Sequence, residues 1–197
     1  GAGFIGPVHI ESIRRAGGVE VVALFHPVEK EVEAKAASFA IPHFYADFDK
    51  MIAEENFDCI HICTPNNLHY PMAKAALLAG KHVVCEKPLA TTVEQAKELV
   101  LLAKKYNRVH AVNFNLRYYP LVRQMKRMRE KNELGDVYSV VGSYLQDWLF
   151  YATDYNWRLE PDKSGDSKAI ADIGSHLIDL VEYITGLSIT EVMADFS

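Results

Sequence analysis

A glycine motif at the start of this 197-residue chain has the spacing of a phosphate-binding turn. Gly1, Gly3 and Gly6 fit G-x-G-x-x-G, in which a tight turn brings the backbone close to a pyrophosphate at a helix N-terminus. A helical stretch follows the motif, and a β-branched run over 19–25 follows the helix. This order predicts a dinucleotide site, with a plain glycine-rich connector as the alternative.

A lysine follows another strand-like run. Glu86-Lys87-Pro88 comes directly after the apolar segment 82–85, so the Lys87 side chain is expected at the carboxyl end of a strand. An ammonium beside a bound cofactor loses its proton more easily and serves as an acid or base. The sharp turn predicts a cis Lys87–Pro88 peptide bond. The alternative is an ordinary Glu-Lys pair on a surface turn.

Asp172, His176 and Asp179 are spaced i, i+4 and i+7, which puts them on one face of a helix expected over 171–185. A carboxylate one turn from a histidine suits a general base, because it orients the imidazole and raises its basicity. Metal ligation and a capped helix with a core histidine are the alternatives.

The first half of the chain alternates strand and helix patterns. Strands are expected over 19–25, 58–63, 82–85 and 109–113, and helices over 28–39, 68–79 and after a capping box at 91–95. Such alternation predicts a parallel sheet covered on both faces. Together with the glycine turn, this order predicts a dinucleotide-binding domain over 1–115.

The pattern changes in the second half. We expect a basic helix near 121–128, a long strand over 137–145 in a different sheet, a loop over 146–168, the helix 171–185 and a strand over 191–196. Residues 116–197 are expected to begin a second domain. Since the glycine turn has no strand before it, we expect a piece of a longer protein that folds poorly alone.

Composition narrows the class of protein. Apolar residues make up 49% and charged residues 24%, which supports a buried core. A net charge of −5 argues against nucleic-acid or anionic-membrane binding, and no apolar run approaches the about 20 residues of a membrane span. The three cysteines lie in strand-like runs, which predicts buried free thiols in a reducing, cytoplasmic compartment.

Three further segments bear on ligand binding. The turn 64–69 follows a strand, where open α/β sheets bind ligands, although Pro and Asn favour turns anyway. His26 stands where an acidic residue would bind the ribose of NAD, so NAD and NADP are not distinguished. The aromatic stretch 144–157 suits a sugar ring, a subunit interface or a loop core.

The order of these motifs resembles the glucose–fructose oxidoreductase, inositol dehydrogenase and rhizopine-catabolism oxidoreductase family. The resemblance rests on the glycine turn, Thr-Pro-Asn-Asn-Leu-His, Glu-Lys-Pro-Leu-Ala, Asn-Phe-Asn-Leu-Arg-Tyr and Asp-Ile-Gly-Ser-His-Leu-Ile-Asp, in that order. It implies a Rossmann domain followed by an α+β domain with a mostly antiparallel sheet. It also implies a homo-oligomer, a dimer or a tetramer.

The resemblance implies specific site residues. Lys87, Asp172 and His176 match catalytic positions. The positions implied to bind the cofactor are Gly1, Gly3, Phe4, Ile5, Gly6, His26, Thr64, Pro65, Asn66, His69, Glu86, Lys87, Asn115 and Arg158. Those implied to bind substrate are Lys87, Arg117, Tyr118, Trp157, Asp172 and His176, with no metal.

The expected activity is hydride transfer between a nicotinamide, NAD or NADP, and a secondary alcohol of a sugar or cyclitol. His176 would take the hydroxyl proton, Asp172 would orient its ring, and Lys87 would stabilise the developing alkoxide. Two alternatives stay open: an NAD-dependent glycosidase of the same family, and a regulator that senses a dinucleotide without turnover. Neither nucleic acid nor membrane is an expected partner.

Overall fold

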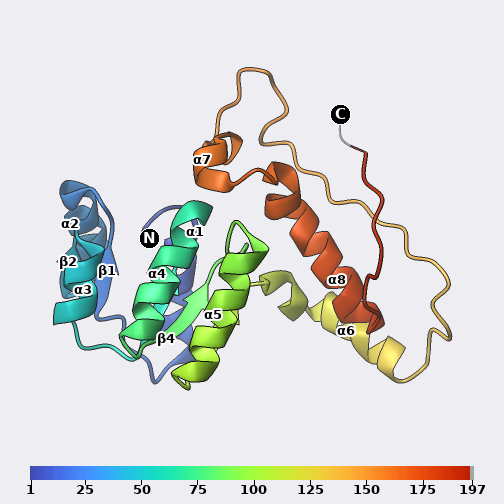
Figure 1. The fold of residues 1–197 in the computed structure, drawn as a ribbon, viewed down its shortest axis with the longest axis horizontal. Helices are drawn as coiled ribbons and strands as arrows, with labels where there is room; N and C mark the ends of the chain where they lie inside the picture. Colours follow the sequence, from blue (N-terminus) through green and yellow to red (C-terminus); the bar gives the residue numbers. More distant parts are fainter. Residues whose placement is uncertain (196–197) are drawn as a thin grey trace. The chain divides into compact units, whose positions relative to one another are not determined.

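The computed structural model describes residues 1–195 and divides the chain into two compact units. The first unit consists of Gly1–Asn113 with Glu160–Asp166, and the second of Phe114–Leu159 with Ser167–Ser197. Figure 1 shows their elements along the chain.

The first unit is built on parallel strands. β1 (Ala23–Phe25) pairs with β2 (His43–Tyr45), and β4 (His82–Cys85) lies between β3 (Cys59–Ile62) and β5 (His110–Val112). The expected parallel sheet is therefore confirmed. β1 is shorter than the expected strand 19–25, and β2 was not expected, because its exposed side chains show no alternation of apolar and polar residues.

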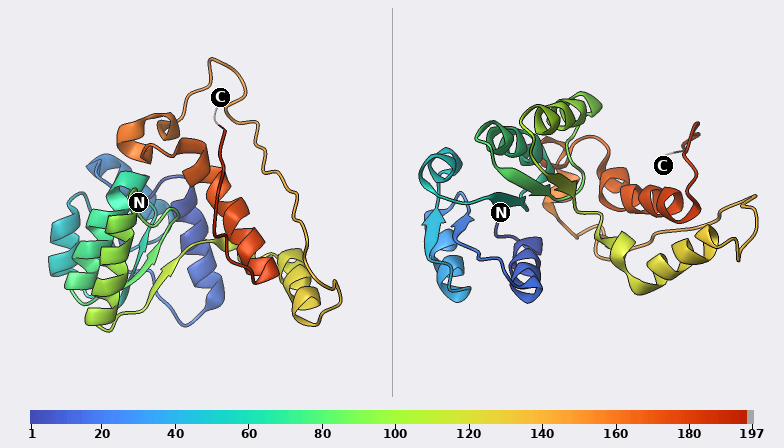
Figure 2. Two further views of the ribbon diagram at one scale, coloured as in Figure 1. Left: turned by 45° about the vertical axis from the view of Figure 1, so that its right-hand side comes forward. Right: turned by 90° about the horizontal axis from the view of Figure 1, so that it is seen from below.

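Helices connect these strands. They are α1 (Ile5–Ala16), α2 (Glu29–Ser38), α3 (Phe48–Glu54), α4 (Asn66–Leu78), α5 (Val93–Lys105) and the short α7 (Pro161–Ser164). Figure 2 shows α4 and α5 on one face of β3–β4–β5 and α1 on the other. The expected cap of α5 is confirmed, since the Thr92 side chain accepts a hydrogen bond from the Gln95 backbone. Within residues 1–195 no helix is long and apolar enough to cross a bilayer.

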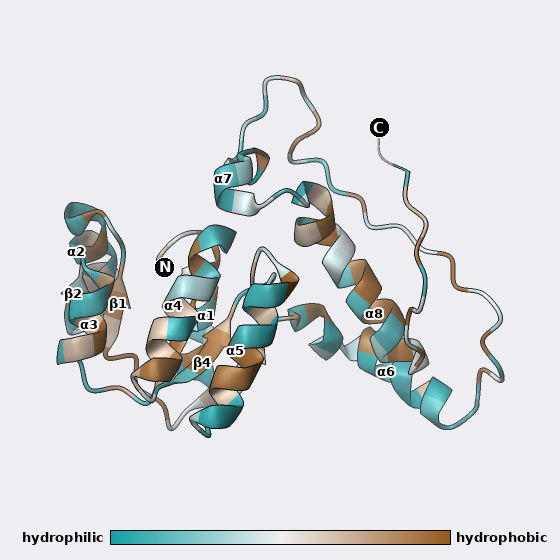
Figure 3. Ribbon diagram, viewed as in Figure 1, coloured by the Kyte–Doolittle hydropathy of each residue, from teal (hydrophilic) through white to brown (hydrophobic). Residues whose placement is uncertain are grey.

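Two apolar clusters hold the first unit together. One joins β3 and β4 to α4 and α5 through Ile62, Leu77, Cys85 and Leu99, and these apolar stretches appear brown in Figure 3. The other joins α1, β1 and α2 through Ile10, Leu24 and Val32. The first cluster thus covers one face of β3–β4–β5, and the second packs α1 and α2 against β1.

A cavity of about 520 Å³ lies between β1 and β3. Its lining includes Val21, Leu24, Cys59 and Ile60. Cys59 is exposed, so the expectation that all three thiols are buried was wrong for this residue; Cys63 and Cys85 are buried, and all three are free. Cys59 is exposed because it begins the strand that borders the cavity. The expectation of a further strand in this sheet stays a prediction.

The second unit is helical. It contains the turn η1 (Asn115–Tyr118), α6 (Pro120–Glu130), the turn η2 (Trp157–Leu159), the π-helical turn η3 (Ile170–Gly174) and α8 (Ser175–Thr185). Lys126 on α6 donates to the carbonyl of Tyr183 on α8 at 3.3 Å and lies over its ring. The left-handed Gly186, with φ of 73°, ends α8 as expected.

Two expected strands are not formed in the described part of this unit. Residues 137–145 and 187–195 are largely exposed and pair with no strand there, and Phe196 lies outside the described residues. An alternating segment forms a ladder only when a neighbouring strand satisfies its backbone groups. The expectation of strands over 137–145 and 191–196, and with them the antiparallel sheet, is therefore not met in residues 114–195.

Candidate dinucleotide-binding and catalytic residues

The glycine turn is closely packed at two positions and open at the third. A Cβ on Gly1 would lie 2.4 Å from the Cys63 carbonyl oxygen, and one on Gly6 would lie 2.5 Å from the Gly1 carbonyl oxygen. A Cβ on Gly3 would meet nothing within 4 Å. Gly1 and Gly6 therefore allow the turn to pack on the end of β3, while Gly3 leaves its outer side open for a ligand.

The N-terminus of α1 suits an anion. Its first turn contains no acidic residue, and Phe4, which is 92% exposed, makes no side-chain cap. The first amide groups of a helix lack partners within the helix and carry the positive end of its dipole. With the open side at Gly3, this start of α1 fits the pyrophosphate of a dinucleotide.

We predict that Gly3→Ala and Gly6→Ala have different effects. Gly3→Ala should leave the melting temperature unchanged and weaken NAD binding about tenfold, or ~1.4 kcal/mol, because the new methyl projects where the ligand approaches. Gly6→Ala should lower the melting temperature, because its methyl meets the Gly1 carbonyl. Thermal melts and NAD titrations check this. Equal effects of both variants on melting would contradict it.

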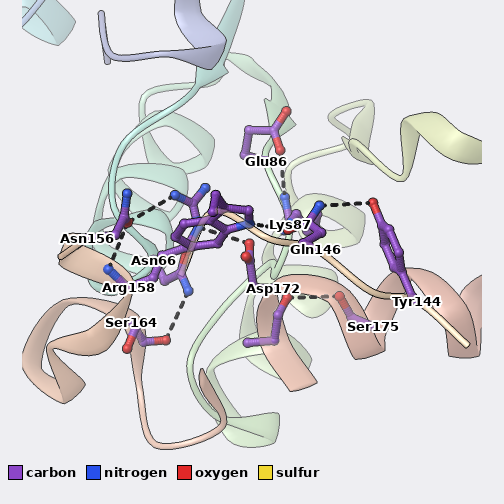
Figure 4. Close-up of polar contacts among 12 residues, drawn as sticks. Asn66, Glu86, Lys87, Tyr144, Gln146, Asn156, Arg158, Ser164, Asp172 and Ser175 are labelled. Carbon is purple, nitrogen blue, oxygen red and sulfur yellow. Dashed lines mark hydrogen bonds and ion pairs between the residues drawn. The ribbon is translucent and has the colours of Figure 1, made fainter. Parts of the chain in front are cut away.

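The turn after β3 carries a buried hydroxyl. Thr64 Oγ1 is inaccessible to solvent and has no hydrogen-bond partner among the described residues. Beside it, Asn66 is buried and its side-chain amide donates to the Ser164 carbonyl at 2.9 Å, as drawn in Figure 4. Asn66 thus ties the start of α4 to α7, while Pro65 precedes α4 at the N-cap.

His69 lies behind this turn and is 1% exposed. Its Nδ1 is 2.6 Å from the Pro88 carbonyl oxygen and its Nε2 is 2.9 Å from the Thr64 carbonyl oxygen. Burial lowers the pKa of His69, and a neutral ring donates to only one of the two carbonyls. His69 therefore links the turn after β3 to the Lys87 turn, and its expected contact with the cofactor stays a prediction.

The Lys87 turn follows β4 at the carboxyl edge of the sheet. The Lys87–Pro88 peptide is cis, so that prediction is confirmed. Glu86 is fixed by two side chains: His9 Nε2 lies 2.8 Å and Asn113 Nδ2 lies 2.5 Å from its Oε1. Its Oε2 accepts the Lys87 backbone N–H at 3.3 Å (Figure 4). Glu86 thus organises the backbone that carries Lys87.

The His9–Glu86 pair is largely buried, with side chains 8% and 12% exposed. Burial alone lowers the pKa of His9, but its interactions with Cys63 and Glu86 outweigh that effect and raise it to about 9. Burial raises the pKa of Glu86, and the hydrogen bonds from His9 and Asn113 bring it below its usual value. The raised pKa of His9 stabilises the fold fully below about pH 6.5, and this contribution is lost as pH rises through about 9.

His26 follows β1 and lies beside a carboxylate. Its Nδ1 accepts the Val28 backbone N–H at 3.2 Å, and its Nε2 is 3.5 Å from Glu31 Oε2. Because Nδ1 accepts a hydrogen bond, the ring carries its proton on Nε2, which is the nitrogen that faces the Glu31 carboxylate. The expected acidic residue is absent at position 26, but the Glu31 carboxylate lies 3.5 Å from the His26 ring.

In the second unit, Asp172 is held by Arg158. Arg158 Nε donates to Asp172 Oδ1 at 2.9 Å (Figure 4). The guanidinium carbon lies 4.6 Å from the ring centroid of Trp157 and 5.6 Å from that of Trp148. Stacking on two indoles fixes the guanidinium plane. The aromatic stretch thus supports Arg158, which in turn binds the Asp172 carboxylate. Trp157 therefore acts on Asp172 indirectly, through Arg158.

His176 is the second residue of α8, which directly follows the π-helical turn that contains Asp172. His176 is 8% exposed. Its ring packs edge-on against the rings of Phe114 and Tyr144, with centroid distances of 5.8 Å to Phe114 and 6.1 Å to Tyr144. The single helix expected over 171–185 is therefore a π turn followed by α8, and the expected pairing of Asp172 with His176 stays a prediction. Such turns occur frequently at functional sites.

Asp179 is bound by Arg117. Arg117 Nε donates to Asp179 Oδ2 at 2.7 Å, and its Nη2 donates to Oδ1. This bidentate pair satisfies both oxygens of the Asp179 carboxylate. In residues 1–195 no group of three His, Cys, Asp or Glu side chains is placed to hold a metal ion. Asn115 and Tyr118 on η1 are exposed. The substrate contacts of Arg117 and Tyr118 and the cofactor contact of Asn115 stay predictions.

The motifs did not reveal how Glu86 is held. His9 on α1 and His61 on β3 belong to none of the motifs above, and Asn113 begins the Asn-Phe-Asn-Leu-Arg-Tyr motif without its contact with Glu86 being expected. The available signal was spacing: His9 comes three residues after Gly6, which turns it toward the same side of α1 as the buried Gly6 and Ile10. Its partner 77 residues further on is a product of the fold.

Known proteins match both parts of the chain. Residues 1–114 match the oxidoreductase family with an NAD-binding Rossmann fold, and residues 122–197 match the GFO/IDH/MocA C-terminal domain. Levoglucosan dehydrogenase from Pseudarthrobacter phenanthrenivorans is 35% identical over 198 residues, covering 94% of this chain and 50% of that protein. The chain spans about half the length of the curated relatives it matches.

Solved structures agree. Levoglucosan dehydrogenase in complex with NADH and levoglucosan matches with a TM-score of 0.87 and 32% identity, over 94% of this chain and 52% of that one. The myo-inositol 2-dehydrogenase of Lactobacillus plantarum matches with a TM-score of 0.81 and 26% identity, over 94% and 55%. Since the matches cover the parallel-sheet unit and the helical one, the chain belongs to the GFO/IDH/MocA oxidoreductase family, with an NAD-binding Rossmann fold in its first unit.

Proposed function

We propose that the protein is a nicotinamide-dependent oxidoreductase that interconverts a secondary alcohol and a ketone on a sugar or cyclitol. The main supporting observation is that the glycine turn and the Lys87 turn lie at one edge of one parallel sheet. Gly1 packs on the carboxyl end of β3, and Glu86 N donates to the Ile62 carbonyl at 2.9 Å at that same end. Open α/β sheets bind dinucleotides at this edge.

The bound nicotinamide would supply the hydride chemistry, and the chain's own residues would bind, orient and move protons. In this proposal the Lys87 ammonium donates a hydrogen bond to the reacting oxygen and stabilises its developing negative charge. His176 takes the hydroxyl proton as a general base. Arg158 holds the Asp172 carboxylate at 2.9 Å, and Asp172 is proposed to orient the His176 ring, so Arg158 would act on the base indirectly.

A substrate screen tests the proposal. The complete protein is incubated with cyclitols, aldoses and anhydrosugars, with NAD and with NADP separately, and reduced nicotinamide is measured. The names of the relatives, levoglucosan dehydrogenase and myo-inositol 2-dehydrogenase, suggest the first substrates to include. Turnover of at least one secondary alcohol supports the proposal, and a silent panel with a protein that binds NAD favours a sensing role.

Cofactor choice is expected to depend on the strand end at His26. His26→Asp adds a carboxylate beside Glu31, and like charges oppose a 2′-phosphate, so the ratio of kcat/KM for NAD over NADP should rise about tenfold, or ~1.4 kcal/mol. Glu31→Gln removes the existing carboxylate and should move the ratio the other way. Kinetics of both variants with both cofactors check this. If the NAD/NADP ratio of kcat/KM is unchanged in both variants, the side chains at this strand end do not contact the ribose that distinguishes the two cofactors.

A further inference from the structure

One partly buried polar chain links α1 to the Lys87 turn. It runs from His61 Nδ1 to His9 Nδ1 at 2.9 Å, from His9 Nε2 to Glu86 Oε1 at 2.8 Å, and from Glu86 Oε2 to the Lys87 backbone N–H at 3.3 Å. Asn113 adds a second donor to Glu86 Oε1 at 2.5 Å. All of these residues belong to the first unit.

The chemistry of the groups fixes the direction of these bonds. A carboxylate only accepts, so the proton between His9 and Glu86 belongs to His9 Nε2. Glu86 then has one oxygen for His9 and Asn113 and the other for the Lys87 backbone. Without the donors of His9 and Asn113, the carboxylate of Glu86 would be strongly destabilised and would rotate toward other hydrogen-bond donors. The orientation of Glu86 therefore depends on the donor that α1 supplies.

His9 also belongs to the helix whose N-terminus carries the glycine turn. It lies three residues after Gly6 and is buried together with Ile10. Because a helix is rigid, a displacement of its first turn also displaces the side chains of its next turn. The same helix thus contacts the expected pyrophosphate surface at its start and Glu86 one turn later.

We propose that His9 is a positioning residue for Lys87: it orients Glu86 from the dinucleotide-binding helix and thereby sets the backbone from which the lysine side chain projects. The effect on turnover rests on the proposed oxidoreductase function, but the effect on the Lys87 backbone does not. His61 contacts the Nδ1 side of the His9 ring and contributes less than Glu86 to the positioning of Lys87.

Two variants separate the contacts of His9. The side-chain amide of His9→Gln replaces the Nε2 donor that faces Glu86, whereas that of His9→Asn replaces Nδ1, which faces His61. His9→Asn should lower kcat roughly 10- to 100-fold, with the sugar KM and the NAD dissociation constant within about twofold. His9→Gln should keep kcat within about threefold of the parent. His43→Asn, which replaces an exposed histidine that pairs with Glu55 away from the Lys87 turn, serves as control and should change nothing in kcat.

Hydrogen exchange at the Lys87 amide gives a readout that needs no turnover. Exchange should be faster in His9→Asn than in His9→Gln or the parent, because Glu86 Oε2 then leaves the amide. If the parent shows no dehydrogenase activity but the exchange difference appears, the proposed function fails and the positioning role stands. Equal exchange and equal kcat in both variants would overturn the positioning role. Equal losses in both, together with a lower melting temperature, would overturn it as well and assign His9 a purely structural part.

Discussion

Lys87→Ala is expected to lower kcat about 10²–10³-fold while leaving the NAD dissociation constant nearly unchanged. The lost hydrogen bond belongs to the transition state, where charge develops on the reacting oxygen, and not to cofactor binding. Lys87→Arg should restore little, because the bulkier planar guanidinium has a different reach and does not present its donors where the compact ammonium does. Steady-state kinetics and NAD titration of the complete protein check both variants.

The matched control is Lys81→Ala. Lys81 precedes β4 at the opposite end of the strand, where its Nζ donates to the Phe57 carbonyl at 2.7 Å. Removing this ammonium should leave kcat within about twofold and lower the melting temperature slightly, because one hydrogen bond contributes about 0.5–1.5 kcal/mol. A Lys87→Ala protein with the turnover of the parent would exclude Lys87 from the reaction.

His176→Gln is expected to lower kcat about 10²–10⁴-fold, the usual range for loss of a general base. The glutamine amide keeps polarity at the start of α8 but accepts no proton near neutral pH. The pH profile of kcat/KM should lose its acidic limb in the variant, because that limb reports protonation of the base. Rates across a pH series, measured for the parent and the variant, check this.

His110→Gln provides the comparison for His176. His110 is an exposed histidine on β5, and its replacement should change neither kcat nor the pH profile. The melting temperature of His176→Gln is to be measured alongside, since the ring packs edge-on against Phe114 and Tyr144. An acidic limb that persists in His176→Gln would assign the base to another residue.

Most of the first unit was predictable because its signals are local. The strand 82–85 and the helix after Thr92 follow from an apolar run, a capping threonine and flanking turn residues, and the structure confirms them. β2 and α3 were missed because they are short and lie partly exposed. The strand over 137–145 was wrong for the described residues, because alternation reports a capacity for pairing and not the presence of a partner.

The hydrogen-bond partners around the Lys87 turn could not be predicted from the motifs. Glu86 and Lys87 stand out as a motif, but the donors that fix Glu86 come from α1 and from the end of β5, 77 and 27 residues away. Long-range contacts of this kind exist only once the chain has folded.

Isotope transfer tests the central claim most directly. Once the screen has identified a substrate, the sugar or cyclitol is deuterated at the reacting carbinol carbon and incubated with the complete protein and NAD. We predict that deuterium appears at C4 of the reduced nicotinamide, in amounts equal to the ketone formed, and that Lys87→Ala slows this transfer. Release of an aglycone with deuterium returned to the sugar would point to glycoside cleavage, and a failure of deuterium to reach the nicotinamide would contradict the oxidoreductase assignment.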